Sequence, residues 1–156
     1  SGRQMIFKRT DRQKKNRIQE TSTDQIMNRI RESPGKFAHG SLKYMKELHF
    51  EDFLKELMEK YQCSPRQMII RSCLSKPFVY QIMKGERVPG RDVIFRMSLA
   101  LRADVEETQH LLMLAEKGIL YPKVKRDAAI LCCIEAGKNL EETNQFLEEY
   151  GEKKLL

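Results

Sequence analysis

One stretch of the chain, residues 63–101, constrains the fold more than any other, because it places short amphipathic segments in close succession. Ser64 suits the N-cap of the first segment, and Pro65 suits the first helical position, where its missing N–H costs no hydrogen bond. Ser75 suits the N-cap of the second segment, and Gly85 suits its end, as a C′ glycine in the left-handed conformation. The stretch therefore predicts a helix, a tight turn, a second helix and then a third.

The second of these helices has two different sides. Phe78, Val79 and Ile82 recur at i, i+1 and i+4, which places them on one buried stripe. The opposite side is polar and carries Lys76, Tyr80, Gln81 and Lys84. A short helix of this kind, closely preceded by another helix, is typical of a helix-turn-helix DNA reader.

At these residues the chain resembles the λ-repressor/Cro-like (XRE) family of transcriptional regulators. The resemblance covers roughly residues 50–105, and the matching positions are Ser64, Met68, Leu74, Ser75, Val79, Gln81, Ile82, Gly85, Arg87, Pro89, Ala100 and Leu101. The family usually has a small residue where this chain has Ile69, and a turn glycine where it has Cys73. Both positions govern how closely the two helices approach. The resemblance implies an α-helical regulator that binds double-stranded DNA, usually as a homodimer at pseudo-palindromic sites.

The helical periodicity predicts an all-α chain with four parts. Residues 1–20 are polar and basic and predict a flexible arm, either laid along DNA phosphates or simply solvated. Residues 21–49 predict a short N-terminal helical segment. Residues 50–118 predict a five-helix λ-repressor-like unit, and residues 119–156 a C-terminal helical hairpin packed on the same core.

The N-terminal segment is predicted in more detail from its caps and breakers. Ser22 and Gln25 predict a capping box for a first short helix. Pro34-Gly35 predicts the break after it. The run Ser41–Leu48 predicts a second short helix with its apolar residues on one side.

Two motifs recur 35 residues apart in the same order: Arg91-Asp92 as Arg126-Asp127, and VEET at 105–108 as LEET at 140–143. Acidic residues are common at helix starts, so the second match alone also fits chance similarity. The Arg-Asp pair at the same offset favours a true repeat, whose second copy completes the core. Arg126 is expected to pair with acidic residues around this hairpin. With such an extension, the resemblance narrows to a group of XRE-type regulators of Firmicutes.

The charge balance of the chain favours an anionic partner. It has 29 basic and 22 acidic residues, a net charge of +7, which does not choose between nucleic acid and an anionic membrane surface. Residues 102–156 hold eight basic and eleven acidic residues and are not a predicted nucleic-acid surface. The chain has no apolar run of about 18 residues and no apolar secretory core near its start, so a cytoplasmic protein is expected.

The cysteines and histidines predict neither a metal site nor a cofactor. Cys63, Cys73, Cys132 and Cys133 show no CxxC or Cys/His spacing and are expected to be reduced, partly buried thiols. The three histidines are scattered and have no ligand partner three or four residues away. The chain also lacks a glycine-rich phosphate loop, a nucleophile elbow and an HExxH motif, so catalysis is not expected.

The predicted recognition helix, residues 76–84, supplies the candidate base contacts, which are Lys76, Pro77, Tyr80 and Gln81. Gln81 suits a bidentate contact to adenine and Lys76 a contact to guanine O6 and N7, each giving about 1–3 kcal/mol of discrimination. Tyr80 either stacks on the DNA or covers the core. The side chains expected to contact phosphates are Arg66, Gln67, Lys84, Arg87 and Arg91.

One alternative of a different class stays open. The chain would then be a protein–protein adaptor or an antitoxin-like regulator, and its helical surface would hold a partner protein. Binding that weakens steeply with salt and prefers one DNA sequence favours the regulator. Salt-insensitive binding through an apolar patch favours the adaptor.

Overall fold

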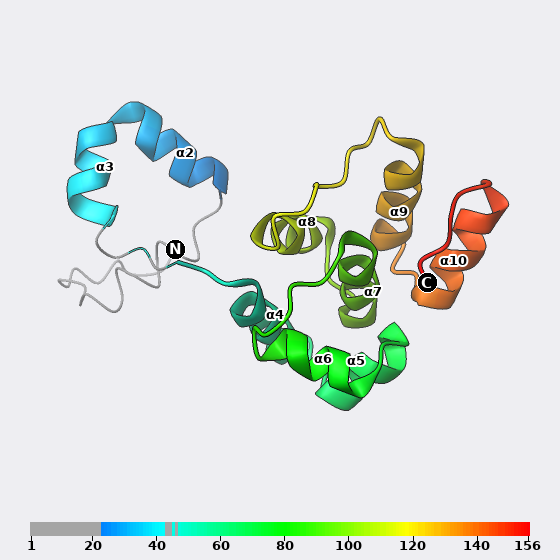
Figure 1. Cartoon of the computed structure of the whole chain (residues 1–156). Coiled ribbons are helices and arrows are strands. Elements are labelled where there is room, and N and C mark those ends of the chain that lie inside the picture. Colours follow the sequence, from blue (N-terminus) through cyan, green and yellow to red (C-terminus); the bar gives the residue numbers. More distant parts are fainter. Residues whose placement is uncertain (1–22, 43–44, 46) are drawn as a thin grey trace, which may run out of the picture. The chain divides into compact units, whose positions relative to one another are not determined.

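Every regular element that the structure describes is an α-helix, which confirms the all-α prediction (Figure 1). The computed structural model describes residues 23–42, 45 and 47–156, so the predicted basic arm lies outside the described residues. The chain divides into two compact units, Ser1–Glu47 and Leu48–Leu156. None of the described helices has the length and apolar content that a membrane span requires.

The helices follow one another along the chain with short connections. The first unit contains α2 (Thr23–Glu32) and α3 (Pro34–Ser41). The second unit contains α4 (Phe50–Lys60), α5 (Pro65–Ser72), α6 (Lys76–Met83), α7 (Arg91–Leu101), α8 (Val105–Leu114), α9 (Lys125–Glu135) and α10 (Leu140–Glu149).

In the first unit, the predicted break after the first helix is present, whereas the second predicted helix was wrong. Pro34-Gly35 begins α3, and the chain leaves helical geometry only at Ser33 (φ −155°, ψ 83°). Proline is accepted at the start of a helix, where no N–H is needed, so it marks a beginning here. The helix predicted for Ser41–Leu48 is not formed at Met45 or at residues 47–48. The predicted cap Ser22 lies outside the described residues.

In the second unit, the predicted caps of α5 and α6 are present. Ser64 Oγ accepts a hydrogen bond from Gln67 N (3.1 Å), and Gln67 Oε1 accepts one from Ser64 N (3.0 Å), which completes a capping box for α5. Ser75 Oγ caps α6 by accepting from Phe78 N (3.4 Å). Gly85 follows α6 with φ +75°, the left-handed conformation predicted for it.

Helix α7 lies at the centre of the second unit, between the α5–α6 pair and the C-terminal helices (Figure 1). Ile94, Phe95 and Met97 have no exposed surface, and the helix stays buried through Leu101. Full burial of such a side chain stabilises a fold by about 1.5–3 kcal/mol. One helix therefore anchors both the predicted DNA reader and the C-terminal hairpin.

The predicted repeat extends well beyond the motifs that revealed it. Helix α10 follows α8 at an offset of 35 residues, and the bounds of α9 follow those of α7 to within one residue of this offset. Gln109 Nε2 donates to Leu120 O (2.9 Å), while Leu120 N donates to Gln109 Oε1 (2.7 Å). Asn144 holds Leu155 in the same two-fold way, at 3.0 and 2.7 Å. The equivalent side chains thus fix the equivalent segments after the second helix of each hairpin.

The left-handed backbone positions repeat as well. Arg102 (φ +60°) and Glu116 (φ +55°) end the helices of the first hairpin. Their equivalents are Gly137 (φ +68°) and Gly151 (φ +69°). Glycine adopts this conformation without the clash that a Cβ atom introduces. The second hairpin therefore makes the same turns at a lower conformational cost.

Two reciprocal ion pairs join the hairpins. Arg91 donates to both carboxylate oxygens of Asp127, at 2.8 and 2.6 Å. Arg126 donates to both carboxylate oxygens of Asp92, at 2.9 and 3.0 Å, which confirms the expectation that Arg126 pairs with an acidic residue. The two equivalent Arg-Asp motifs therefore bind each other.

The repeat differs at one buried polar position. In the first hairpin, the hydroxyls of Ser98 and Thr108 hydrogen-bond to each other. In the second hairpin, Cys133 replaces the serine, and among the described residues the buried hydroxyl of Thr143 has no partner stronger than the Cys133 thiol. A buried hydroxyl with only a weak partner costs free energy, because it loses its bonds to water.

The substitution Cys133→Ser is expected to raise the free energy of unfolding by about 0.5–1 kcal/mol, because it recreates the serine–threonine pair of the first hairpin. Chemical denaturation of the two proteins measures the difference. Cys63→Ser is the control, because Cys63 is also buried and its equivalent change creates no such pair. Equal destabilisation by both substitutions would contradict the prediction.

A capping box begins the second helix of each hairpin. In α8, Asp104 Oδ1 accepts from Glu107 N (2.8 Å), and Glu107 Oε1 accepts from Asp104 N (2.9 Å). In α10, Asn139 and Glu142 make the same exchange, at 2.8 and 3.0 Å. These boxes satisfy main-chain N–H groups that the first turn of a helix leaves without partners.

Glu107 has a second role that Glu142 lacks. Lys60 Nζ donates to Glu107 Oε2 (2.8 Å), and the hydroxyl of Tyr61 donates to Glu107 Oε1, so the end of α4 is tied to the start of α8. Burial opposes ionisation of Glu107, but the hydrogen bonds from Lys60, Tyr61 and the Asp104 amide outweigh it and lower the pKa of this carboxyl.

Glu107→Gln is expected to destabilise the protein by roughly 1–2 kcal/mol near neutral pH, because it removes a charged acceptor. A lowered folded-state pKa means that this stability is complete above the ordinary pKa of 4.5 and is lost as the pH falls below it. Unfolding free energies of both proteins across pH 3–7 measure the effect. A difference that stays constant down to the lowest pH would contradict it.

Candidate nucleic-acid interface

The predicted recognition helix α6 is anchored by its apolar side. Val79 and Ile82 have no exposed surface and belong to the core of the second unit, and α6 packs against α4 and α5. The predicted apolar stripe is confirmed for these two residues, whereas Phe78 is only partly buried. The position of α6 is therefore fixed by packing that leaves its other side free.

The predicted base contacts lie on that other side. Lys76 and Pro77, in the first turn of α6, are exposed, and Gln81 is partly exposed. Tyr80 keeps 37% of its surface exposed, so its ring is not part of the core. These four side chains share one helix and its outer side, which is the arrangement that contact with base edges requires.

Arg87 lies against α6 next to one of these residues. Its guanidinium is 5.0 Å from the centroid of the Phe78 ring, a cation–π contact. Its Nη1 donates to Gln81 Oε1 at 3.4 Å. Arg87 is exposed and therefore places a positive charge beside the partly exposed Gln81 amide.

Two of the predicted phosphate contacts also make contacts within the protein. Gln67 Oε1 completes the Ser64 capping box, and this bond does not use the Gln67 amide NH2, the group that would donate to a phosphate. Arg91 donates to Asp127 and to the main-chain oxygens of Gly118 (2.7 Å) and Ile119 (2.9 Å). We therefore remove Arg91 from the phosphate-binding set: its donors are engaged within the protein, because it belongs to the repeated Arg-Asp motif.

Arg96 lies near this site, and no local sequence pattern marks its role. Its Nε donates to Ser72 O (3.0 Å), and its Nη2 donates to Cys73 O (2.9 Å). Cys73 adopts φ +57° at the end of α5, the position where the resembled family has glycine. A cation beside the last carbonyls of a helix satisfies groups that have no helical partner. Arg96 thus holds the turn between α5 and α6.

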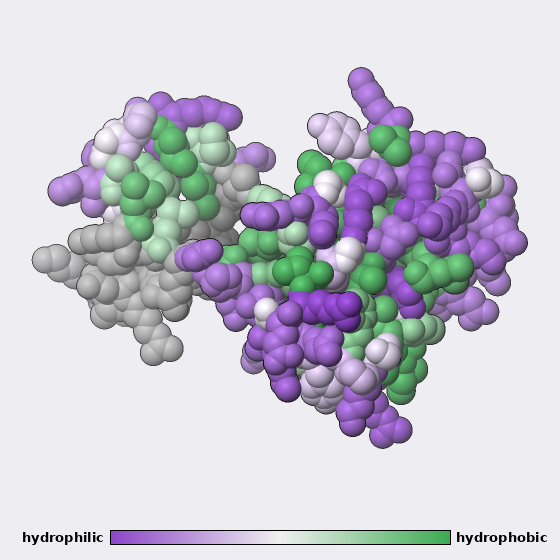
Figure 2. Space-filling model, viewed as in Figure 1, coloured by the Kyte–Doolittle hydropathy of each residue, from purple (hydrophilic) through white to green (hydrophobic). Residues whose placement is uncertain are grey.

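The charge around α5 and α6 is positive. Residues 64–90 hold five basic residues and one acidic residue, and all six are exposed: Arg66, Arg71, Lys76, Lys84, Arg87 and Glu86. On the face shown in Figure 2, hydrophilic side chains cover most of this unit and the apolar ones form small separate patches. A basic surface around an amphipathic helix is what contact with a phosphate backbone needs.

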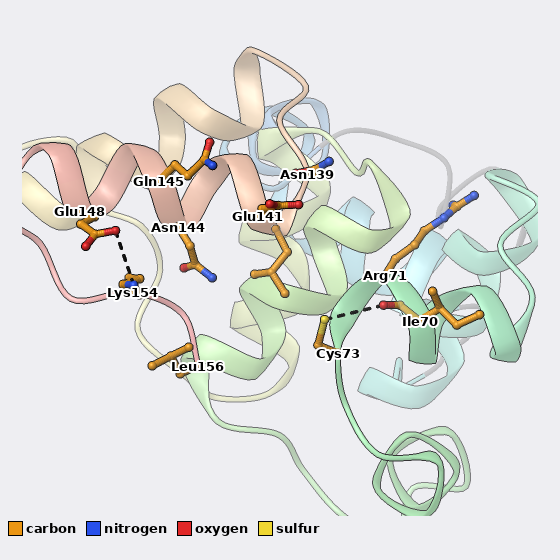
Figure 3. Close-up of a pocket in the computed structure, with 11 residues that line it drawn as sticks. Ile70, Arg71, Cys73, Asn139, Glu141, Asn144, Gln145, Glu148, Lys154 and Leu156 are labelled. Atoms are coloured by element: carbon orange, nitrogen blue, oxygen red, sulfur yellow. Dashed lines mark hydrogen bonds and ion pairs between the residues drawn. The ribbon is translucent and has the colours of Figure 1, made fainter.

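A groove of about 640 Å³ lies between α5 and α10 (Figure 3). Ile70, Arg71 and Cys73 line one side, and residues of α10 and the C-terminal segment, among them Glu141 and Lys154, line the other. Basic and acidic side chains are mixed here, so the groove has no excess of positive charge. This surface differs in character from the exposed side of α6.

All four cysteines are free. Cys63 and Cys133 are buried, whereas Cys73 and Cys132 are exposed, so only part of the set is buried. Burial raises the pKa of the Cys63 and Cys133 thiols. Within the described part of the chain, no three acidic, histidine or cysteine side chains form a group able to hold a metal ion.

Comparisons with family models, with curated proteins and with solved structures gave no match.

Proposed function

We propose that this chain is a sequence-specific DNA-binding transcriptional regulator of the XRE type, which inserts α6 into the major groove of double-stranded DNA. The observation that carries the proposal is the two-sided character of α6. Val79 and Ile82 are fully buried, and Lys76, Pro77, Tyr80 and Gln81 remain outside. A helix fixed by packing on one side and polar on the other can present side chains to base edges without unfolding.

In this proposal, Arg66 and Lys84 contact phosphates on the two sides of the groove. Arg66 lies in the first turn of α5, Lys84 directly follows α6, and both side chains are exposed. Arg87 adds a further positive charge beside Gln81. Such contacts set the register of α6 on the duplex, and the base contacts then select the sequence. Two copies of the chain would bind the halves of a pseudo-palindromic site.

The dependence of DNA affinity on salt tests the phosphate contacts. Wild type is expected to bind a mixed-sequence duplex with an affinity that falls linearly on a logarithmic salt scale. The double variant Arg66→Ala, Lys84→Ala is expected to make this slope shallower by about 2, roughly one for each lost contact. Fluorescence anisotropy at several potassium chloride concentrations measures the slope.

A matched control uses Lys117→Ala with Lys123→Ala, two exposed lysines in the connection between α8 and α9. It removes the same charge from a surface that the proposal leaves off the DNA, so its slope is expected to equal that of wild type. The same reduction in both double variants would mean that net charge alone drives binding, and it would contradict the proposed interface.

The groove between α5 and α10 supports the alternative function, a protein–protein adaptor or antitoxin-like regulator. Ile70 and Leu156 border it with 63% and 83% of their surfaces exposed, and they lie beside charges of both signs. Mixed apolar and charged groups suit a protein partner better than a phosphate backbone. Absence of any salt-dependent DNA binding by wild type would favour this alternative.

A further inference from the structure

The contacts between the two hairpins of the second unit have the pattern of a symmetric dimer. Arg91 of the first hairpin binds Asp127 of the second, and the equivalent Arg126 of the second binds Asp92 of the first. At the level of helices, α7 packs on α10 and the equivalent α9 packs on α8. Contacts that are reciprocal in this way define a two-fold relation, whereas stacked repeats make each contact in one direction only.

The same relation extends to the main chain around the ion pairs. Arg91 Nε and Nη2 donate to Gly118 O (2.7 Å) and Ile119 O (2.9 Å). Arg126 Nε and Nη2 donate to the equivalent Lys153 O (3.0 Å) and Lys154 O (3.4 Å). Each guanidinium therefore makes two kinds of contact: it binds main-chain oxygens at the end of its own hairpin, and it binds the aspartate carboxylate of the other hairpin.

We infer that α7–α8 carries a surface that is complementary to the equivalent surface of α9–α10. Within one chain, α9–α10 occupies this surface. The same surface accepts the α9–α10 hairpin of a second copy. Equivalent side chains supply both halves of the contact, so nothing in its chemistry requires the halves to belong to one molecule. The partner is a second copy of this chain, and the product is a dimer with exchanged hairpins.

The connection between the hairpins has the form of a hinge. Gln109 and Arg91 hold the chain to the first hairpin as far as Leu120, and α9 begins at Lys125. Only residues 121–124 lie between these points. Their single side-chain tie to the second hairpin, among the described contacts, runs from Tyr121 N to Asp127 Oδ2 (2.9 Å). A short connection makes the intramolecular contact dominant, with an effective concentration in the millimolar range.

Charge reversal of one hairpin at a time separates contact within a chain from contact between chains. The first variant carries Arg91→Asp with Asp92→Arg, and the second carries Arg126→Asp with Asp127→Arg. In each variant alone, like charges face each other across the hairpins. When the two variants are mixed, the reversed first hairpin of one copy meets the reversed second hairpin of the other, and the remaining halves meet as in wild type. All ion pairs then form between the two copies.

The two variants are given different affinity tags, refolded together from denaturant, and analysed by affinity capture and by mass. The expected result is a one-to-one complex of twice the monomer mass, with a melting temperature above that of either variant alone. Each variant refolded with a differently tagged copy of itself sets the background from any other self-association, because an exchanged dimer of one variant keeps the like charges facing each other. Failure of the mixture to exceed this background would overturn the inference, whether the single variants are folded or not.

A quadruple variant that combines all four reversals tests whether the two hairpins still bind each other when every charge in their contact is reversed. It is expected to melt above either double variant and to stay at the wild-type mass, because its ion pairs form again within one chain. It should still melt below wild type, because aspartates at positions 91 and 126 cannot donate to the main-chain oxygens that the two arginines bind. A quadruple variant that melts no higher than the double variants would overturn the inference too, since charge complementarity would then not define the surface. Neither result depends on DNA, so these experiments do not test the proposed regulator function, which the DNA-binding measurements test separately.

Discussion

Asp127→Ala is expected to lower the free energy of unfolding by about 2–4 kcal/mol, because it leaves the Arg91 guanidinium without its partner at a largely buried site. The side chain of Asp127 is 5% exposed and that of Arg91 is 30% exposed. Asp127 also accepts a hydrogen bond from Tyr121 N, so its loss frees a main-chain donor as well. Urea denaturation of both proteins measures the change.

The repeat supplies the control for this prediction. Asp92 is the equivalent of Asp127, but it is 33% exposed and binds only Arg126 among the described contacts. Asp92→Ala is therefore expected to cost roughly 1 kcal/mol, as a more solvated pair does. Equal costs for both substitutions, or a larger cost for Asp92→Ala, would show that the buried Asp127 does not hold the hairpins together.

The same contacts determine the direction in which the pKa of Asp127 is shifted, and therefore how its contribution to stability depends on pH. Burial opposes its ionisation, but the hydrogen bonds from Arg91 and the Tyr121 amide outweigh burial and lower the pKa of this carboxyl below its ordinary value of 3.8. The pair therefore contributes its full stability above that pH, and the contribution is lost as the pH falls below it. The difference in the free energy of unfolding between wild type and Asp127→Ala should therefore shrink as the pH falls below 3.8.

The second large effect is expected on DNA recognition. The double variant Lys76→Ala, Gln81→Ala should lose about 2–6 kcal/mol of preference for a specific site over mixed-sequence DNA, because each base contact gives about 1–3 kcal/mol. Its helix should stay folded, since both side chains lie outside the core. Competition binding between the specific duplex and a mixed-sequence duplex measures this preference.

Lys84→Ala is the contrasting variant, because Lys84 is proposed to contact phosphate. It is expected to weaken binding to both duplexes by similar factors, and therefore to leave the preference almost unchanged. If Lys84→Ala lost the preference and the Lys76, Gln81 variant kept it, α6 would not be the helix that reads the bases.

Local signals were enough to place most helices of the second unit. Ser64, Ser75, Asp104 and Asn139 each cap the helix that the sequence predicted, and Gly85 ends α6 as expected. Such caps act within a few residues, so they can be read without knowing the fold. Pro34 marked the end of α2 correctly, but it also begins α3, a helix that was not predicted, because proline suits the first turn of a helix.

The candidate site was harder to predict, because several of its contacts join distant parts of the chain. Arg91 was assigned to phosphate, although the repeat that paired Arg126 with an acidic residue applied equally to Arg91. The second half of the Ser64 capping box was also visible as Gln67, three residues on. By contrast, Arg96 binds the end of α5 from another helix, and no local pattern marks that role.

The most direct test of the proposed function is selection of bound sequences from a pool of random DNA duplexes at moderate salt. Wild type is expected to enrich one defined site, and the Lys76→Ala, Gln81→Ala variant is expected to lose that enrichment while it keeps salt-sensitive binding to the pool. Enrichment of no sequence by the folded wild-type protein would contradict the account of α6 as a DNA reader.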